Sequence, residues 1–204
     1  MLMFVPADLP LMPDIDFSML ASQDYGGWEM FKLTKSAKKD KDKYKVQEFF
    51  EDFEYKNPNF LEWIKLLPHK GMINVKIHRQ DKINGAPLHV DLMYPQRDIL
   101  HYHHLQVNEP CGYRVIMDGN PNDTTYALNP KGDKVYLNMP KNPKTNTYIQ
   151  NFTTCIHGVE EEIHRDILFF HFMIDPKRHE ELVRKSLKMY REYAIFFNMD
   201  TKYV

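Results

Sequence analysis

A histidine and an aspartate two residues apart are the side chains in this sequence best placed to do chemistry. His89 and Asp91 flank Val90, and residues i and i+2 of a β-strand point to the same face. One imidazole and one carboxylate can therefore reach a single metal ion from one strand. A second imidazole would complete a two-histidine, one-carboxylate triad, which leaves open coordination positions on Fe(II). By itself the pair is better explained as two unrelated surface residues.

A second imidazole and a guanidinium follow far downstream. His157 comes after a β-rich segment and directly before Gly158, which permits a close approach of two backbones. Arg165 lies eight residues later, at the start of an apolar run that we expect to be a core strand. A guanidinium in this position can bind a carboxylate with two parallel hydrogen bonds. It can also form a salt bridge with one of the glutamates at 160–162.

Together, His89-x-Asp91, His157 and Arg165 resemble the motif of the 2-oxoglutarate/Fe(II)-dependent oxygenases, over roughly residues 70–176. Nucleic-acid demethylases of that superfamily carry a second arginine six residues after the first, whereas this chain has His171 there. That departure favours the groups that hydroxylate proteins or amino acids. The sequence looks most like the aspartyl/asparaginyl β-hydroxylase branch, on three stretches: His103–Val107, Pro110–Val115 and Arg165–Pro176.

The resemblance implies a fold and an activity. The fold would be mainly β with flanking helices, around a double-stranded β-helix (jelly-roll, cupin-like) core. His89, Asp91 and His157 would bind Fe(II). The enzyme would be a dioxygenase that uses O₂ and 2-oxoglutarate as cosubstrates, hydroxylates a substrate and releases succinate and CO₂. The substrate class stays open between a protein side chain, an amino acid and a small metabolite.

The resemblance also implies residues for the cosubstrate. Arg165 would bind the 5-carboxylate of 2-oxoglutarate. His104 matches a histidine that lies near the cosubstrate in the β-hydroxylase branch, and Tyr102 would share its face of the strand. Many relatives place Ser or Thr two residues after the arginine, but this chain has Ile167 there. The second hydrogen bond to the cosubstrate must then come from elsewhere, and Tyr102 and Tyr148 are the candidates.

One further arginine and several histidines have no assigned role. Arg114 is either an exposed residue of a strand or a contact to cosubstrate or substrate. The spacing of His101 and His103 places them on the face opposite His104. We interpret His171 as a core histidine. The remaining histidines, at positions 69, 78, 164 and 179, are expected at the surface.

Periodicity predicts helices before and after a series of short strands. Apolar residues recur at helical spacing over 46–55, and Asn57-Pro58 is typical of a helix start that would run to about Leu67. Strands are expected at 73–77, 88–93, 100–107, 113–117, 134–139, 147–153 and 166–174. Asp175-Pro176 then begins a last helix, whose inner stripe would be Val183, Leu187, Tyr190 and Ala194.

These elements suggest a β-sandwich or barrel with helices packed against it. We expect one domain: residues 1–70 form an N-terminal arm and helices, 71–176 the core, and 177–204 a C-terminal helix. Within the first part, residues 1–30 read as an irregular arm, since Pro6, Pro10 and Pro13 interrupt it.

Composition excludes several other classes of protein. The formal net charge of −1 argues against a nucleic-acid partner, which usually requires a basic surplus. No apolar run is long enough to cross a membrane, and the N-terminus lacks the basic residues of a secretory signal. Two cysteines form neither a disulfide scaffold nor a C-x₂-C zinc motif. We expect reduced thiols and a cytoplasmic location; the sequence does not indicate an oligomeric state.

Two alternative functions remain open. One is a cupin-type metalloprotein with another chemistry, such as a thiol dioxygenase or an isomerase. The other is a barrel that binds a partner without catalysis. Arg165 favours the oxygenase over the cupin, because only the oxygenase needs a fixed cation for a diacid. The intact triad disfavours the non-catalytic barrel.

Overall fold

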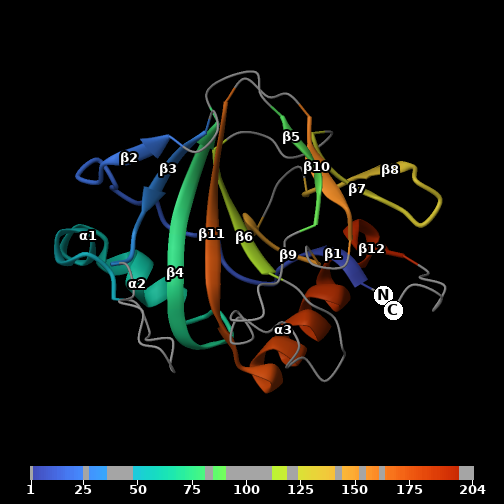
Figure 1. The fold of residues 1–204 in the computed structure, drawn as a ribbon. Helices are drawn as coiled ribbons and strands as arrows, with labels where there is room; N and C mark the ends of the chain where they lie inside the picture. The colour runs from blue at the N-terminus through green and yellow to red at the C-terminus, as the bar shows by residue number, and fades with distance from the viewer. Residues whose placement is uncertain are drawn as a thin grey trace, which may run out of the picture.

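The computed structural model describes residues 2–24, 28–35, 48–80, 85–90, 112–118, 124–140, 144–151, 155–160 and 164–197. Their strands form one large and one small sheet (Figure 1). The large sheet contains β1 (Leu2–Pro6), β2 (Ser22–Asp24), β3 (Glu29–Lys32), β4 (His69–Gln80), β6 (Gly112–Asp118), β9 (Thr147–Gln150), β11 (Arg165–Ile174) and β12 (Ile195–Phe196). The small sheet contains β5 (Ala86–His89), β7 (Thr125–Leu128), β8 (Lys134–Tyr136) and β10 (His157–Val159). The α-helices are α1 (Glu51–Lys56), α2 (Pro58–Ile64) and α3 (Pro176–Met189).

Both sheets are antiparallel. The eight strands of the large sheet lie in the order β12-β1-β9-β6-β11-β4-β3-β2, and the four of the small sheet in the order β5-β10-β7-β8. The long strands β4 and β11 pair along almost their whole length, from Arg165 opposite Gln80 to Ile174 opposite His69. The expected class, mainly β with flanking helices, is therefore confirmed.

The apolar run after Arg165 forms the expected central strand, β11, between β4 and β6. Both faces of β11 are apolar, because one packs against the helices and the other lies toward the small sheet. Leu168 and Phe170 belong to the main hydrophobic core on the helix side. Ile167 and Phe169 alternate with them and lie on the opposite side of the sheet. That opposite side, the inner face, carries the residues of the candidate site.

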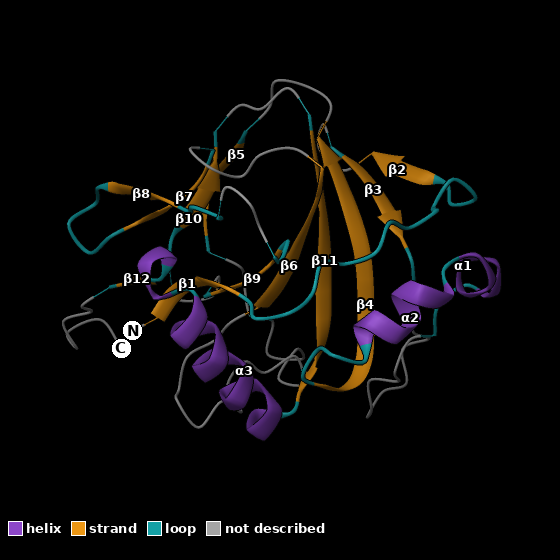
Figure 2. Ribbon diagram, turned by 180° about the vertical axis from the view of Figure 1, so that it is seen from behind, coloured by secondary structure: helices purple, strands orange, loops and turns teal. Residues whose placement is uncertain are grey.

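Helices α1, α2 and α3 cover the other side of the large sheet (Figure 2). Phe60 and Trp63 of α2 contact the ring of Phe170, with ring centroids 6.4 and 6.0 Å apart. Trp63 also donates its indole N–H to the carbonyl oxygen of Pro10. Full burial of each such side chain contributes roughly 1.5–3 kcal/mol. This packing holds β11 and β4 in place, and with them the inner face.

The last helix begins as expected, but its buried stripe is rotated from the expected one. Asp175 caps α3 by accepting from the backbone N–H of Arg178, and Pro176 is its first residue. The buried residues include His179, so its expected surface position is wrong. It is only 2% exposed and shares a hydrogen bond with the Tyr113 hydroxyl of β6. The full buried stripe is His179, Leu182, Ser186 and Tyr190; Val183, Leu187 and Ala194 are only partly buried.

The buried histidine makes stability depend on pH. Burial lowers the pKa of His179 to about 4 from an ordinary value of 6.5. Between these pH values the unfolded chain binds a proton that the folded chain does not, so stability falls as the pH falls through this window. We expect this group to lower the free energy of unfolding by about 2 kcal/mol between pH about 7 and about 4.5. Denaturant unfolding at both pH values measures it.

The variant His179→Gln isolates this contribution from the other titrating groups. Glutamine can bond to the Tyr113 hydroxyl but does not titrate. Its unfolding free energy should therefore change less steeply with pH than that of the unchanged protein. Equal slopes in the two proteins would contradict the assignment. Burial also lowers the pKa of His78, to about 3. The contribution of His78 to the pH dependence should therefore be present in both the unchanged protein and His179→Gln.

The N-terminal residues differ from the irregular arm expected over 1–30. Strand β1 pairs with both β9 and β12, and β2 and β3 extend the large sheet beyond β4. The prolines do not prevent this, because Pro6 is the last residue of β1 and the other two follow it. The helices before the core are shorter than expected: α1 begins at Glu51 and α2 ends at Ile64. No helix in the described part of the chain is long and apolar enough to cross a membrane.

Candidate active site on the facing sides of the two sheets

The two histidines expected as metal ligands lie side by side in the small sheet. His157 of β10 is the direct antiparallel partner of His89 of β5. Their ring centroids are 4.4 Å apart. His157 is 6% exposed, whereas His89 is exposed. Two imidazoles at this separation, one buried and one reachable from the surface, can both contact one ion.

Each imidazole is oriented by a backbone carbonyl two residues before it. His89 Nδ1 lies 2.7 Å from the oxygen of Pro87, and His157 Nδ1 lies 3.0 Å from the oxygen of Cys155. Since a carbonyl oxygen only accepts, Nδ1 must carry the proton in both rings. The lone pair of each neutral ring is then on Nε2. Histidines that bind metals typically donate their other N–H in this way, which fixes tautomer and ring direction.

The close spacing of the two strands depends on Gly158. A Cβ added there would lie 3.0 Å from the backbone oxygen of Ala86 and 3.1 Å from the hydroxyl oxygen of Tyr126. No side chain fits at this position without moving one of those neighbours. The expected close backbone approach next to His157 is therefore present.

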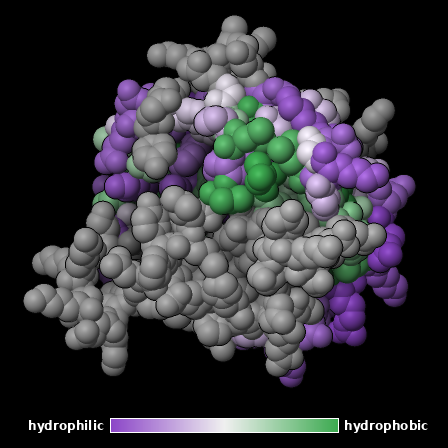
Figure 3. Space-filling model, turned by 45° about the vertical axis from the view of Figure 1, so that its right-hand side comes forward, coloured by the Kyte–Doolittle hydropathy of each residue, from purple (hydrophilic) through white to green (hydrophobic). Residues whose placement is uncertain are grey.

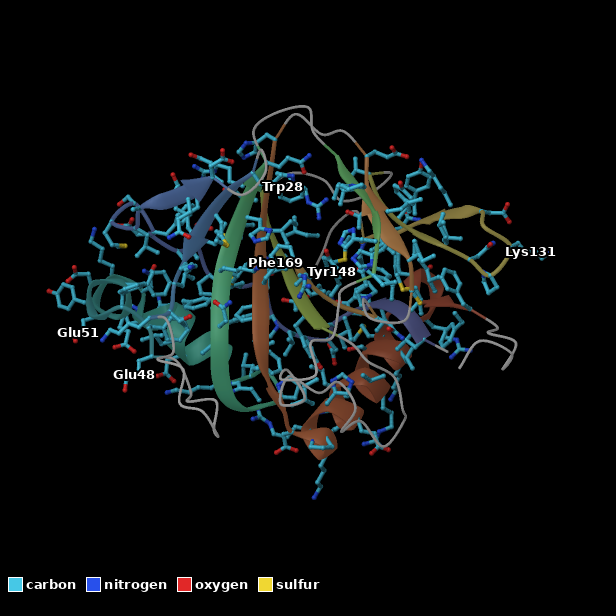
Figure 4. The ribbon with its side chains drawn as sticks, viewed as in Figure 1. Trp28, Glu48, Glu51, Lys131, Tyr148 and Phe169 are labelled. Atoms are coloured by element: carbon cyan, nitrogen blue, oxygen red, sulfur yellow. The ribbon has the colours of Figure 1, made fainter. Side chains whose placement is uncertain are left out.

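The inner face of the large sheet looks toward this small sheet. Tyr148 of β9 and Ile116 of β6 pack with Ala127 of β7 and Val135 of β8 in one hydrophobic cluster. In Figure 4 the labelled side chains of Phe169 and Tyr148 lie between the ribbon of β11 and the strands β5 and β10. The inner-face residues and the histidine pair therefore belong to the same region of the molecule.

Arg165 is buried on this face and interacts with Tyr148. It is 4% exposed, at the start of β11. Burial raises the pKa of the Tyr148 hydroxyl, while the positive charges of Arg165 and Arg114 and a hydrogen bond with Arg165 act against that rise. A tyrosine hydroxyl beside a buried guanidinium can join it in binding a carboxylate.

The sequence allowed two interpretations of Arg114: an exposed residue of a strand, or a contact to cosubstrate or substrate. The exposed position is wrong. Arg114 is 2% exposed on β6, with its guanidinium 4.1 Å from the centre of the Phe169 ring. Lys76 of β4 lies over the same ring at 5.8 Å, and the His78 ring is 4.4 Å from it. We call Lys76, Arg114 and Arg165 the cationic group.

This cationic group makes the inner face positive. Burial first, and then the charges of Lys76, Arg114 and Arg165, lower the pKa of His78 to about 3. His78 is therefore neutral at physiological pH. Among the described residues, strand alternation places no aspartate or glutamate on the inner face of β4, β9 or β11. An anion is the ligand that such a face would attract.

Exposed apolar residues are the sequence neighbours of both histidines. Leu88 and Val90, next to His89, and Ile156, next to His157, are exposed to 48%, 36% and 46%. Figure 3 shows hydrophobic surface gathered on the side that is turned forward there. Because successive residues of a strand point to opposite faces, these three side chains lie on the face of the small sheet away from the two imidazoles.

Three of the expected site residues lie outside the described residues: Asp91, Tyr102 and His104. The residues that the structure describes contain no group of three or more His, Cys, Asp or Glu side chains able to hold a metal ion. The structure thus brings together His89 and His157, and separately Arg165 and Tyr148. Sequence reasoning missed Lys76, His78 and Gln80, which share the inner face of β4; their i, i+2 spacing was the available signal.

No family model and no curated protein matches this sequence. One similar solved structure is a crystal structure of an oxidoreductase of the 2OG-Fe(II) oxygenase family from Burkholderia pseudomallei. The two chains are 12% identical, and the match covers 78% of this chain and 76% of that chain, with a TM-score of 0.43. That similarity is too weak to assign a fold or function to this chain.

Proposed function

We propose that this protein is an Fe(II)- and 2-oxoglutarate-dependent dioxygenase that hydroxylates a protein side chain, an amino acid or a small metabolite. The observation that carries the proposal is the pairing of His89 with His157, each with Nδ1–H bound to a carbonyl oxygen. The second support is the buried pair of Arg165 and Tyr148 on the sheet that faces them. Such an enzyme needs both ligands for a metal ion and a site for the carboxylate of its cosubstrate.

The strand order supports a double-stranded β-helix for the proposed core. From β4 to β11 the chain alternates between sheets: β4, β6, β9 and β11 join the large sheet, and β5, β7, β8 and β10 the small one. Within the large sheet these four lie in the order β9-β6-β11-β4, flanked by β1 and β3. Two facing four-stranded sets with such exchanges are typical of a jelly roll.

The donor set fits Fe(II). Imidazole nitrogen suits iron, and two histidines with one carboxylate are the ligands of non-haem Fe(II) oxygenases. Asp91 would supply the carboxylate, from the segment that follows His89. When bound, iron would supply the site for O₂ chemistry with 2-oxoglutarate, which gives succinate, CO₂ and the hydroxylated product.

The protein's own residues would then bind and orient the reactants. Arg165 would neutralise the distal carboxylate of 2-oxoglutarate, and the Tyr148 hydroxyl would donate to the same carboxylate. Ile167 and Phe169, which follow Arg165 on the same face of β11, would help to keep water away from the bound carboxylate. Arg114 adds a second buried guanidinium, so the face favours a dianion over a neutral ligand.

Formation of succinate tests this proposal. The purified protein, supplied with Fe(II), ascorbate and 2-oxoglutarate in air, should release succinate slowly without any added substrate. Under nitrogen, addition of 2-oxoglutarate to the Fe(II) protein should produce an absorption band in the visible. If neither signal appears while iron remains bound, a cupin-type metalloprotein with other chemistry is favoured. If iron does not bind, a non-catalytic barrel is favoured.

A further inference from the structure

We propose that Gln80 is a specificity residue for the distal carboxylate of 2-oxoglutarate, acting beside Arg165. This inference rests on the proposed function and adds a residue to it. Ile167 occupies the position where related enzymes often carry a serine or threonine, and Gln80 supplies a donor that Ile167 cannot. It adds a hydrogen bond from a neutral side chain of β4, the strand next to Arg165, to those from Arg165 and Tyr148.

The burial of Gln80 is the first observation. Its side chain is 0% exposed. Neither its amide nitrogen nor its amide oxygen has a hydrogen-bond partner among the described residues. An amide buried in this state is costly, because it has lost its bonds to water without gaining others. A ligand that supplies the missing acceptor explains why such a residue is placed there.

The position of Gln80 is the second observation. It is the direct antiparallel partner of Arg165. Side chains of directly paired residues lie on the same face of a sheet, with Cβ atoms about 4.5–5.5 Å apart. The amide therefore lies beside the base of the guanidinium side chain, on the inner face. A carboxylate held by Arg165 is within reach of the Gln80 amide N–H.

The chemistry of an amide suits this role. Its two N–H groups donate to a carboxylate without adding another positive charge next to Arg165. Charge neutralisation comes from the guanidinium, and the amide adds a directional bond to one oxygen. A ligand with a neutral distal end, such as the 5-amide of 2-oxoglutarate, would lose the charge interaction with Arg165 and would make only a weaker, neutral hydrogen bond to the Gln80 amide. Gln80 therefore sharpens the preference for a dicarboxylate.

The variant Gln80→Met tests the assignment in two independent measurements. Methionine keeps the length of the side chain and removes its polar atoms. Without ligand, its melting temperature should rise, because an unpartnered amide is no longer buried. Binding of 2-oxoglutarate to the Fe(II) protein under nitrogen, measured by calorimetry, should weaken about tenfold. The KM for 2-oxoglutarate should rise by the same factor with kcat unchanged, and iron content should stay the same.

The other buried glutamine provides a matched control. Gln150 of β9 is also 0% exposed, with both amide atoms unpartnered among the described residues. It pairs with Gly112, about six residues along the sheet from Arg165, or roughly 20 Å. Gln150→Met should also raise the melting temperature, but it should leave the affinity for 2-oxoglutarate unchanged. The pair of variants separates the cost of burying an amide from a contact with the ligand.

Two results would overturn the inference. One is Gln80→Met binding 2-oxoglutarate as tightly as the unchanged protein. The other is a melting temperature that falls, which would show that the amide supports the fold. A shorter variant that keeps the amide, Gln80→Asn, should retain discrimination against the 5-amide analogue better than Gln80→Met does. If the unchanged protein itself does not bind 2-oxoglutarate, the proposed function fails, independently of Gln80.

Discussion

Replacing His157 by alanine is expected to abolish Fe(II)-dependent formation of succinate. His157 is the buried member of the histidine pair, and its ring is fixed by the Cys155 carbonyl. Loss of a residue that merely orients a ligand typically costs 10–100-fold in metal affinity, so loss of a ligand should cost at least about a hundredfold. Iron content after gel filtration and succinate release measure the two effects. His89→Ala should behave in the same way.

A distant histidine controls for the general effect of losing an imidazole. His69 of β4 pairs with Ile174, at the opposite end of that strand from Gln80 and Arg165. It is half-buried, with its ring 5.8 Å from that of Phe172. His69→Gln should keep full iron content and full activity. Retention of iron at the original stoichiometry in His157→Ala would remove His157 from the ligand set.

The histidine pair could be predicted from the sequence because its signal is local. The i, i+2 spacing of His89 and Asp91 and the glycine after His157 are visible in the chain itself. The strand pairing that sets His89 opposite His157 is not visible, since it depends on which strands become neighbours across many residues. The same holds for β1. It pairs with β9 near Tyr148 and with β12 near Ile195, and nothing within residues 2–6 predicts these two partners.

The buried polar residues of the inner face were the harder part to predict. Along β4 the side chains alternate, with Val75 and Ile77 toward the helices and Lys76, His78 and Gln80 on the other side. Alternation reveals that a strand has one polar face, but a polar face toward water and one toward a charged interior share the same pattern. Arg114 was left open for this reason. Burial of polar groups is decided by the second sheet, which is built from distant segments.

Replacing Arg165 by methionine is expected to weaken the binding of 2-oxoglutarate about a hundredfold. Hydrogen bonds to charged groups contribute about 1.5–3 kcal/mol each, and a guanidinium can make two to one carboxylate. The loss also leaves the buried Tyr148 hydroxyl without the guanidinium beside it. Iron should remain bound, since Arg165 is not one of the proposed metal ligands. Calorimetric titration of the Fe(II) protein under nitrogen measures the affinity, and metal analysis measures the iron.

A lysine at the same position separates charge from shape. Arg165→Lys keeps the positive charge but replaces the planar fork by a single ammonium group, so its affinity for 2-oxoglutarate should fall between those of the two other proteins. The double variant Arg165→Met/Tyr148→Phe removes both donors and avoids a buried unpartnered hydroxyl. It should be more stable than Arg165→Met, and it should bind 2-oxoglutarate no more tightly. If Arg165→Met binds 2-oxoglutarate within threefold of the original affinity, Arg165 does not hold the distal carboxylate. Its burial beside Tyr148 would then serve the fold alone.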